Sequence, residues 1–153
     1  MFKLYEYLQA IKSDLTATND VYKASGISKM EELLGNLRNS PKCVAVARDS
    51  GDGYLNFKER RLDTGYHLFY LLVRAKLNDH TAVLDAKREA MSAGIEVLER
   101  MKRDSINFGD PAYGVDFSRV DYSEIGPIAG YFGYSFSFLV EQSFKWPTTS
   151  ISS

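Results

Sequence analysis

The sequence is poor in the residues that cross-link small domains or bind metals. Its 153 residues include a single cysteine, Cys43, and two histidines, His67 and His80. One cysteine cannot close a disulfide within the chain, so we expect the hydrophobic core alone to hold the fold in a reducing, intracellular compartment. No segment gathers enough ligand side chains to predict a metal site.

Long apolar runs are also missing. Over residues 1–15, polar positions such as Lys3, Glu6 and Lys12 interrupt the apolar residues, which excludes the continuous apolar core of a secretory signal. No stretch approaches the roughly 18 uncharged apolar residues of a membrane-spanning helix. The sequence therefore predicts a soluble protein without a membrane partner.

Neither sign of charge dominates the chain. Lys and Arg number 19, Asp and Glu number 20, and the formal net charge is −1. Residues 38–108 carry a small positive excess and residues 109–153 a small negative one. This contrast is too weak for the basic face of a sequence-specific nucleic-acid-binding protein. The two regions either meet in a self-association contact or are solvated faces of a monomer.

The composition is otherwise that of an ordinary folded protein. Apolar residues make up 44% of the chain and charged residues 25%, and the length suits one domain. We predict a single α+β domain over residues 1–145 and a short flexible tail over residues 146–153.

Two amphipathic helices are predicted in the N-terminal part of the chain. The first covers residues 2–18, where apolar residues recur at spacings of three and four. These residues are Leu4, Leu8, Ile11 and Leu15. The second covers residues 28–39, begins with the capping-box pair Ser28 and Glu31, and ends before Pro41.

A third helix is predicted over residues 81–103, with Asp79 or Thr81 as its N-cap. Small residues dominate the first half of its apolar face, so this helix can lie close against a sheet. The face consists of Val83, Ala86, Ala90, Gly94, Val97 and Met101.

Four segments have the pattern of β-strands: residues 43–47, 66–75, 113–122 and 131–141. The first two are predicted neighbours, separated by a long charged excursion over residues 48–65. The last alternates large apolar side chains with small or polar ones. The resulting order, α-α-β-β-α-β-β, indicates an α+β fold with a mainly antiparallel β-sheet and helices packed on one face.

The motifs that suggest chemistry are incomplete. Residues 52–59 match the second half of a calcium-binding EF-hand loop, but the same register puts Arg48 where the ion needs a carboxylate. Residues 133–137 lack the last glycine of a nucleophile elbow. Cys43 fits a small buried residue better than a nucleophile paired with a histidine. We predict no catalytic, metal-binding or cofactor-binding residues, and hence no enzyme.

The order of these elements resembles that of tail terminator, or tail completion, proteins of tailed bacteriophages. The resemblance spans most of the chain, through CVAVA, the charged excursion, YHLFYLLVRA, the long helix and the closing GYSFSFLV strand. It implies a structural virion protein that forms a homo-oligomeric ring, typically hexameric. Such a ring caps the tail tube and joins it to the head-tail connector, after assembly in the host cytoplasm. The helix at residues 28–39 departs from the simplest family layout.

The excursion over residues 48–65 is the predicted contact with a neighbouring subunit or with the tube. A connection of this length without its own structure is uncommon unless it has a function. Its candidate contact residues are Arg48, Lys58, Glu59, Arg60 and Arg61. Simple solvation of a charged loop explains the same residues.

Two alternative functions stay open. Another neck, connector or contractile-injection cap protein would show the same order of elements. A small cytoplasmic α+β protein would instead bind a ligand between helix and sheet, in a pocket lined by residues such as Tyr70, Tyr134 and Phe136.

Overall fold

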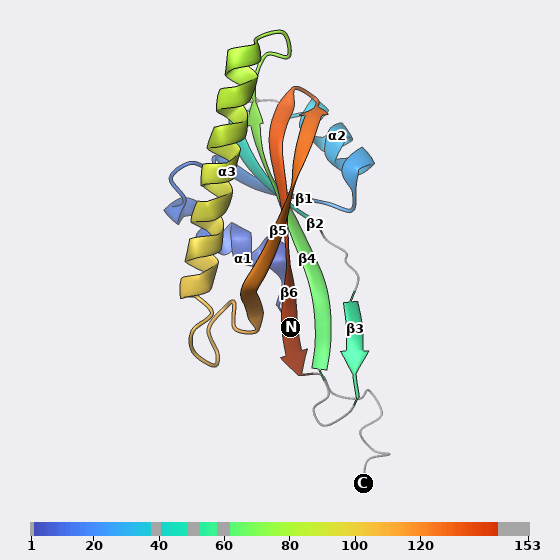
Figure 1. Ribbon diagram of the computed structural model, residues 1–153, viewed down its shortest axis with the longest axis vertical. Helices are drawn as coiled ribbons and strands as arrows, with labels where there is room; N and C mark the ends of the chain where they lie inside the picture. Colours follow the sequence, from blue (N-terminus) through green and yellow to red (C-terminus); the bar gives the residue numbers. More distant parts are fainter. Residues whose placement is uncertain (1, 38–40, 49–52, 58–61, 144–153) are drawn as a thin grey trace.

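Six strands form one mixed, mostly antiparallel sheet, against which three helices pack (Figure 1). The computed structural model describes residues 2–37, 41–48, 53–57 and 62–143, and these counts refer to that part of the chain. In chain order the elements are α1 (Leu4–Ile11), the 3-10 helix η1 (Lys12–Asp14), β1 (Asp20–Ala24), α2 (Ile27–Gly35), β2 (Cys43–Arg48), β3 (Gly53–Asn56), β4 (Leu62–Arg74), α3 (His80–Arg103), β5 (Val115–Ile128) and β6 (Tyr131–Ser143).

The predicted α+β class is confirmed, but the predicted order of elements is wrong. The observed order is α-β-α-β-β-β-α-β-β. One additional strand, β1, lies between the first two helices, and another, β3, lies inside the segment that we predicted to be an excursion without structure. The extent of the single domain, residues 1–145, stays a prediction, and the predicted tail over residues 146–153 lies outside the described residues.

The strands follow the order β1-β2-β4-β6-β5, with β3 also beside β4. β1 runs parallel to β2, whereas the other pairs are antiparallel. The predicted pairing of β2 with β4 is confirmed. β4 is the centre of the sheet, because each of its 13 residues has a partner on β6.

The helices cover both faces of the sheet, so the prediction of helices on one face is wrong. α1 and α3 pack on one face, in a core that includes Phe69, Leu71 and Phe136. α2 packs on the other face, where Met30 and Leu34 meet apolar residues of β2 and β4 (Figure 1). The reason is visible in β2, whose first five residues are all buried. A strand that is apolar on both faces needs cover on both.

The helix boundaries differ from the predicted ones at the N-terminal end of the chain. α1 ends at Ile11 and gives way to a 3-10 turn, instead of continuing to residue 18. α2 begins at Ile27 after Gly26, without a side-chain cap, so the predicted capping box of Ser28 and Glu31 is wrong. For α3 the prediction is confirmed, since Asp79 accepts a hydrogen bond from the backbone N–H of Ala82 at 3.0 Å.

The small-residue face of α3 lies directly on β6, as predicted. The ring of Phe136 stacks on Phe69, with centroids 5.3 Å apart, and fills the space next to Gly94. A β-carbon at position 94 would overlap this ring. Gly133 is equally constrained, because a β-carbon there would overlap the backbone carbonyl of Leu71 on β4.

Candidate interaction surface

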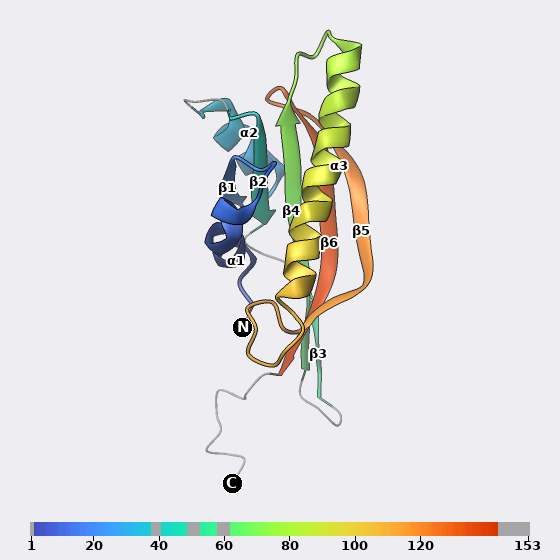
Figure 2. The same ribbon diagram turned by 90° about the vertical axis from the view of Figure 1, so that its left-hand side faces the viewer.

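The sheet extends past its helices as a three-stranded arm. We define the arm as β3, residues 62–66 of β4 and residues 139–143 of β6. β3 pairs with residues 62–65 of β4, and the same residues of β4 pair with residues 140–143 of β6. Figure 2 shows these strand ends projecting beyond α1 and α3. The predicted excursion is therefore in part a continuation of the sheet.

The arm exposes large apolar side chains on both of its faces. Tyr54, Leu55 and Tyr66 are 53%, 50% and 46% exposed, and Phe57 follows β3 directly. The strand alternation puts Leu55 on the face that carries α3, and Tyr54 and Tyr66 on the opposite face. β3 contains no charged residue, and in the described part of the chain it pairs with β4 alone. An exposed, uncharged strand edge of this kind invites pairing with another chain.

A groove of about 550 Å³ runs between α3 and β5, and we call it the α3–β5 groove. Its apolar lining comes from Leu84, Met91 and Ile95 of α3 and from Tyr134 of β6. Tyr122 of β5 is 64% exposed and packs edge-on against Tyr134, with ring centroids 5.8 Å apart. The groove is therefore an apolar surface that the described residues leave unfilled.

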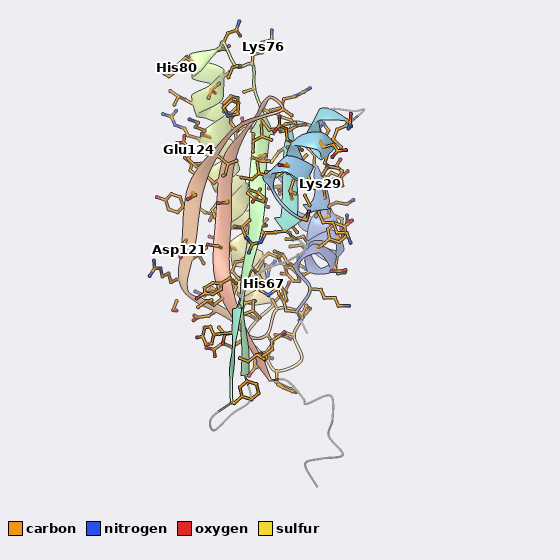
Figure 3. The ribbon with its side chains drawn as sticks, turned by 90° about the vertical axis from the view of Figure 1, so that its right-hand side faces the viewer. Lys29, His67, Lys76, His80, Asp121 and Glu124 are labelled. Carbon is orange, nitrogen blue, oxygen red and sulfur yellow. The ribbon has the colours of Figure 1, made fainter. Side chains whose placement is uncertain are left out.

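The charged residues beside this groove pair with each other. Lys87 of α3 forms an ion pair with Glu124 of β5, and Arg88 lies 3.7 Å from Asp85. Figure 3 shows Glu124 and Asp121 along the outer strand β5. Because these charges largely offset one another, we expect apolar contact to decide what binds in the groove.

β5 forms the edge of the sheet beside the groove. It pairs with β6 on one side, and no other described strand pairs with it. The register is regular over residues 121–125 and shifts at both ends of this stretch. Residues 121–125 are therefore a short, regular strand edge next to an apolar groove.

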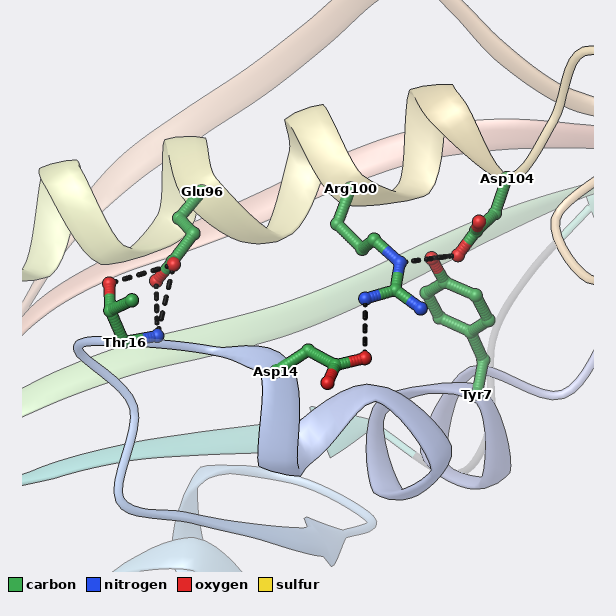
Figure 4. A network of polar contacts seen from close by, with 6 residues as sticks. All are labelled: Tyr7, Asp14, Thr16, Glu96, Arg100 and Asp104. Carbon is green, nitrogen blue, oxygen red and sulfur yellow. Dashed lines mark hydrogen bonds and ion pairs between the residues drawn. The ribbon is translucent and has the colours of Figure 1, made fainter.

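A polar network fastens the long helix α3 to the N-terminal segment (Figure 4). Asp104 accepts hydrogen bonds from the hydroxyl of Tyr7 at 2.7 Å and from Nε of Arg100 at 2.9 Å. Nη1 of Arg100 donates to Asp14 at 2.8 Å. Glu96 accepts from the backbone N–H and the hydroxyl of Thr16, at 3.0 and 2.8 Å. The network borders a groove of about 660 Å³ between α3 and η1.

Two carboxylates of this network, those of Asp104 and Glu96, are held in the charged state. Burial raises the pKa of Asp104, but hydrogen bonds from Tyr7 and Arg100 outweigh it and bring the pKa below the ordinary Asp value. Burial likewise opposes the charge of Glu96, and the hydrogen bonds from Thr16 and Ala17 lower its pKa overall. Satisfied groups of this kind indicate a structural clamp rather than a reacting centre.

Only one of the predicted contact residues falls in the described part of the chain. Lys58, Glu59, Arg60 and Arg61 lie outside it. Arg48 ends β2 on the face that carries α2. Burial raises the pKa of Tyr70, and the positive charge of Arg48 opposes part of this rise. The Nε atom of Arg48 is buried and has no hydrogen-bond partner among the described residues.

The structure also locates the residues of the other motifs. Residues 53–56, which matched part of a calcium-binding loop, form strand β3, whereas residues 49–52, 58 and 59 lie outside the described residues. Within residues 2–37, 41–48, 53–57 and 62–143, no three His, Cys, Asp or Glu side chains form a potential metal site. Cys43 is buried, and burial raises the pKa of its thiol to about 11. In the same ranges no helix is long and apolar enough to span a bilayer.

The three residues named for a ligand pocket lie on different faces of the sheet. Tyr70 packs with α2 on one face of the sheet, whereas Tyr134 and Phe136 face α3 on the other. Phe136 is 2% exposed and fills the core. These three residues therefore do not line one cavity.

The apolar residues of the α3–β5 groove were not recognised from the sequence. Leu84, Met91 and Ile95 form a second apolar stripe on α3, beside the stripe that faces the sheet. Their spacings of seven and four residues are the available signal. What the sequence does not show is that β5 and β6 leave this stripe uncovered.

No model of a known protein family matches this sequence, and no curated protein is significantly similar to it.

Proposed function

We propose that this chain is a structural subunit that assembles with copies of itself into a closed ring. By its resemblance to phage tail terminators, the ring caps a tail tube and joins it to the head-tail connector in the virion. The observation that carries the proposal is the arm, which exposes apolar side chains on both faces beyond the helical cover. A surface of this kind marks a protein-protein contact.

The sheet supports a head-to-tail contact rather than a symmetric pair. Two of its edge strands among the described residues, β3 and β5, lie on opposite sides of β4 and β6. They also differ in character, since β3 is uncharged whereas β5 carries Asp116, Arg119, Asp121 and Glu124. Contacts between unlike surfaces propagate from subunit to subunit and form a ring when the rotation closes.

The resemblance came from the order of predicted elements, to which the structure adds β1 and β3. The partners proposed beyond the ring are the tail tube and connector proteins. The genes next to this one are expected to encode tail tube and portal-type proteins.

The test is the oligomeric state of the full chain, measured by light scattering after size exclusion and by electron microscopy, alone and with tail tubes. We expect ring-shaped particles, hexameric if the resemblance extends to stoichiometry. Replacing Tyr54 and Leu55 by serine should reduce assembly. The matched control is Leu77→Ser, at a 68% exposed position between β4 and α3. Figure 3 shows the neighbouring Lys76 and His80 at the end of the molecule far from the arm.

A chain that stays monomeric at all concentrations and leaves tail tubes undecorated would contradict the proposal. If such a monomer gains thermal stability from a metabolite, the alternative of a small ligand-binding protein is favoured instead.

A further inference from the structure

We infer that the β3 edge of one copy pairs with the β5 edge of the next copy, with Leu55 entering that copy's α3–β5 groove. The inference rests on the self-association proposed above and names the two surfaces that meet. It joins three features that are otherwise unexplained: an uncharged strand at the edge of the arm, the unpaired edge of β5 and an unfilled apolar groove.

The geometry of β5 specifies what the groove can accept. A strand added to the outer edge of residues 121–125 would direct every second side chain to the face that carries α3. On that face lie Tyr122 and, beyond it, Leu84 and Ile95 of α3. The occupant is therefore an extended segment with a free backbone edge and an apolar residue directed toward the groove.

β3 meets these requirements within the described part of the chain. It is an extended segment of four residues, close to the five of the regular β5 stretch. It has an unpaired edge, and Leu55 is directed to the face that carries α3. β1 is the other edge strand, but its apolar residues Val21 and Ala24 are buried against the helices. Its remaining positions include the charged Asp20 and Lys23.

The occupant must come from a second copy. Within one chain β3 is separated from β5 by two strands, β4 and β6, of the same sheet. A chain therefore cannot fill its own groove with its own arm while the sheet is intact. The contact joins unlike surfaces, so each copy uses its arm toward one neighbour and its groove toward the other.

The size of the contact predicts how the assembly forms. Tyr and Phe side chains bury roughly 150–250 Å² each when covered completely. The few half-exposed residues of the arm therefore supply roughly half of the about 800 Å² that each partner buries in a standard interface. One contact is weak on its own. Closing the ring uses both surfaces of every copy and therefore makes the assembly stable. Closed rings and monomers should dominate over isolated dimers.

Disulfide trapping between two chains tests the contact directly. In a Cys43→Ala background, chains carrying Leu55→Cys are mixed with chains carrying Tyr122→Cys and oxidised. Directly opposed residues on paired antiparallel strands have β-carbons about 5 Å apart, within disulfide reach. We expect a mixed disulfide from this pair and none from the control pair of Leu77→Cys with Tyr122→Cys.

A second measurement does not depend on cross-linking. Leu55→Ser should weaken self-association about tenfold, as should Ile95→Gln on the groove side, because each removes part of the same apolar contact. Leu77→Ser should leave self-association unchanged. Circular dichroism and the melting temperature show whether each variant still folds.

The outcomes separate this inference from the proposed function. If rings form but no mixed disulfide appears and Leu55→Ser assembles like the parent, the β3–β5 contact is wrong and the ring proposal stands. If neither rings nor disulfides form, both are wrong. A mixed disulfide that forms alike in the control pair also overturns the contact, because it reflects random collision.

Discussion

Phe136 and Gly94 show how one residue sets the distance between α3 and the sheet. Phe136 occupies the space that a side chain at position 94 would need, so the helix approaches β6 closely. The same helix face continues with Ala86, Ala90 and Ala93, all buried. The close packing of α3 on the sheet therefore depends on small side chains, or none, along this face of the helix.

Gly94→Ala should lower the free energy of unfolding by about 1–3 kcal/mol, because the added methyl group overpacks the core against Phe136. Alanine normally stabilises a helix relative to glycine, so the sign of the effect is diagnostic. Gly35→Ala is the matched control, since no atom lies within 4 Å of a β-carbon there. It should leave stability unchanged or raise it by up to about 1 kcal/mol. Urea denaturation measures both, and equal effects would contradict the packing argument.

At this scale the sequence predicted the buried residues well and the contact residues poorly. The alternation along β6 and the small face of α3 follow from spacing alone, and both are confirmed. From the sequence, Tyr70, Tyr134 and Phe136 are predicted to line one pocket between helix and sheet. The register places Tyr70 opposite Ser135, on the other face of the sheet. Which residues share a face depends on strand pairing, and the sequence does not state the register.

At the scale of elements, the polar network of Figure 4 joins α3 to the N-terminal segment through Glu96 and Arg100. Glu96 accepts hydrogen bonds from the backbone N–H groups of Thr16 and Ala17, which follow η1. Arg100 donates to Asp14 of η1 and to Asp104 at the end of α3. These contacts join residues about 80 positions apart in the chain. The N-terminal segment is thus fixed to the body by polar contacts in addition to its apolar stripe.

Glu96→Gln should lower the free energy of unfolding at neutral pH by about 1–2 kcal/mol, since it removes the charge from these hydrogen bonds. The pKa of Glu96 is lowered in the folded protein. Its contribution is therefore complete above the unfolded value of 4.5 and is lost as the pH falls through the lower folded pKa. The difference between parent and variant should disappear in acid.

Thermal melts from neutral pH to below 4.5 check this prediction. Glu99→Gln, on the same groove, is the control and should stay close to the parent at every pH. A stability difference for Glu96→Gln that persists unchanged in acid would show that shape, and not charge, is responsible.

At the scale of elements, the strongly patterned segments were predicted, including the short strand β2, whereas the two strands without a clear pattern, β1 and β3, were not. β1 has only Val21 and Ala24 buried among polar neighbours, which is too short a pattern to recognise. β3 is a strand because β4 extends past the body and provides a partner for it. The charges around residues 53–56 predicted a loop, whereas pairing with β4 decided the structure. The arm therefore becomes recognisable only from the pairing of β3 with β4 in the folded structure.

At the scale of the whole molecule, the arm and the α3–β5 groove lie at opposite edges of the same sheet, since β4 and β6 separate β3 from β5. Hydrogen exchange measured in dilute and in assembled protein should distinguish them from the rest of the fold. The amides of β3 should exchange quickly in the monomer, because the strand is paired on one side, and at least tenfold more slowly after assembly.

The amides of β2 provide an internal reference, because this strand is paired on both sides in the free subunit and should not change. Residues 76–79, at the opposite end of the molecule, should also exchange alike in both states. Equal exchange of β3 in monomer and assembly would show that the arm stays exposed to water after assembly.

The continuity of β4 has a mechanical consequence. One strand belongs to both the arm and the body, and all 13 of its residues lie opposite a residue of β6. Tension applied to the arm along the strands would therefore run lengthwise into the centre of the subunit and load this ladder in shear, where many bonds must break together. In the proposed ring, such a subunit would pass force from one neighbour to the next through its backbone, without a hinge between the arm and the core.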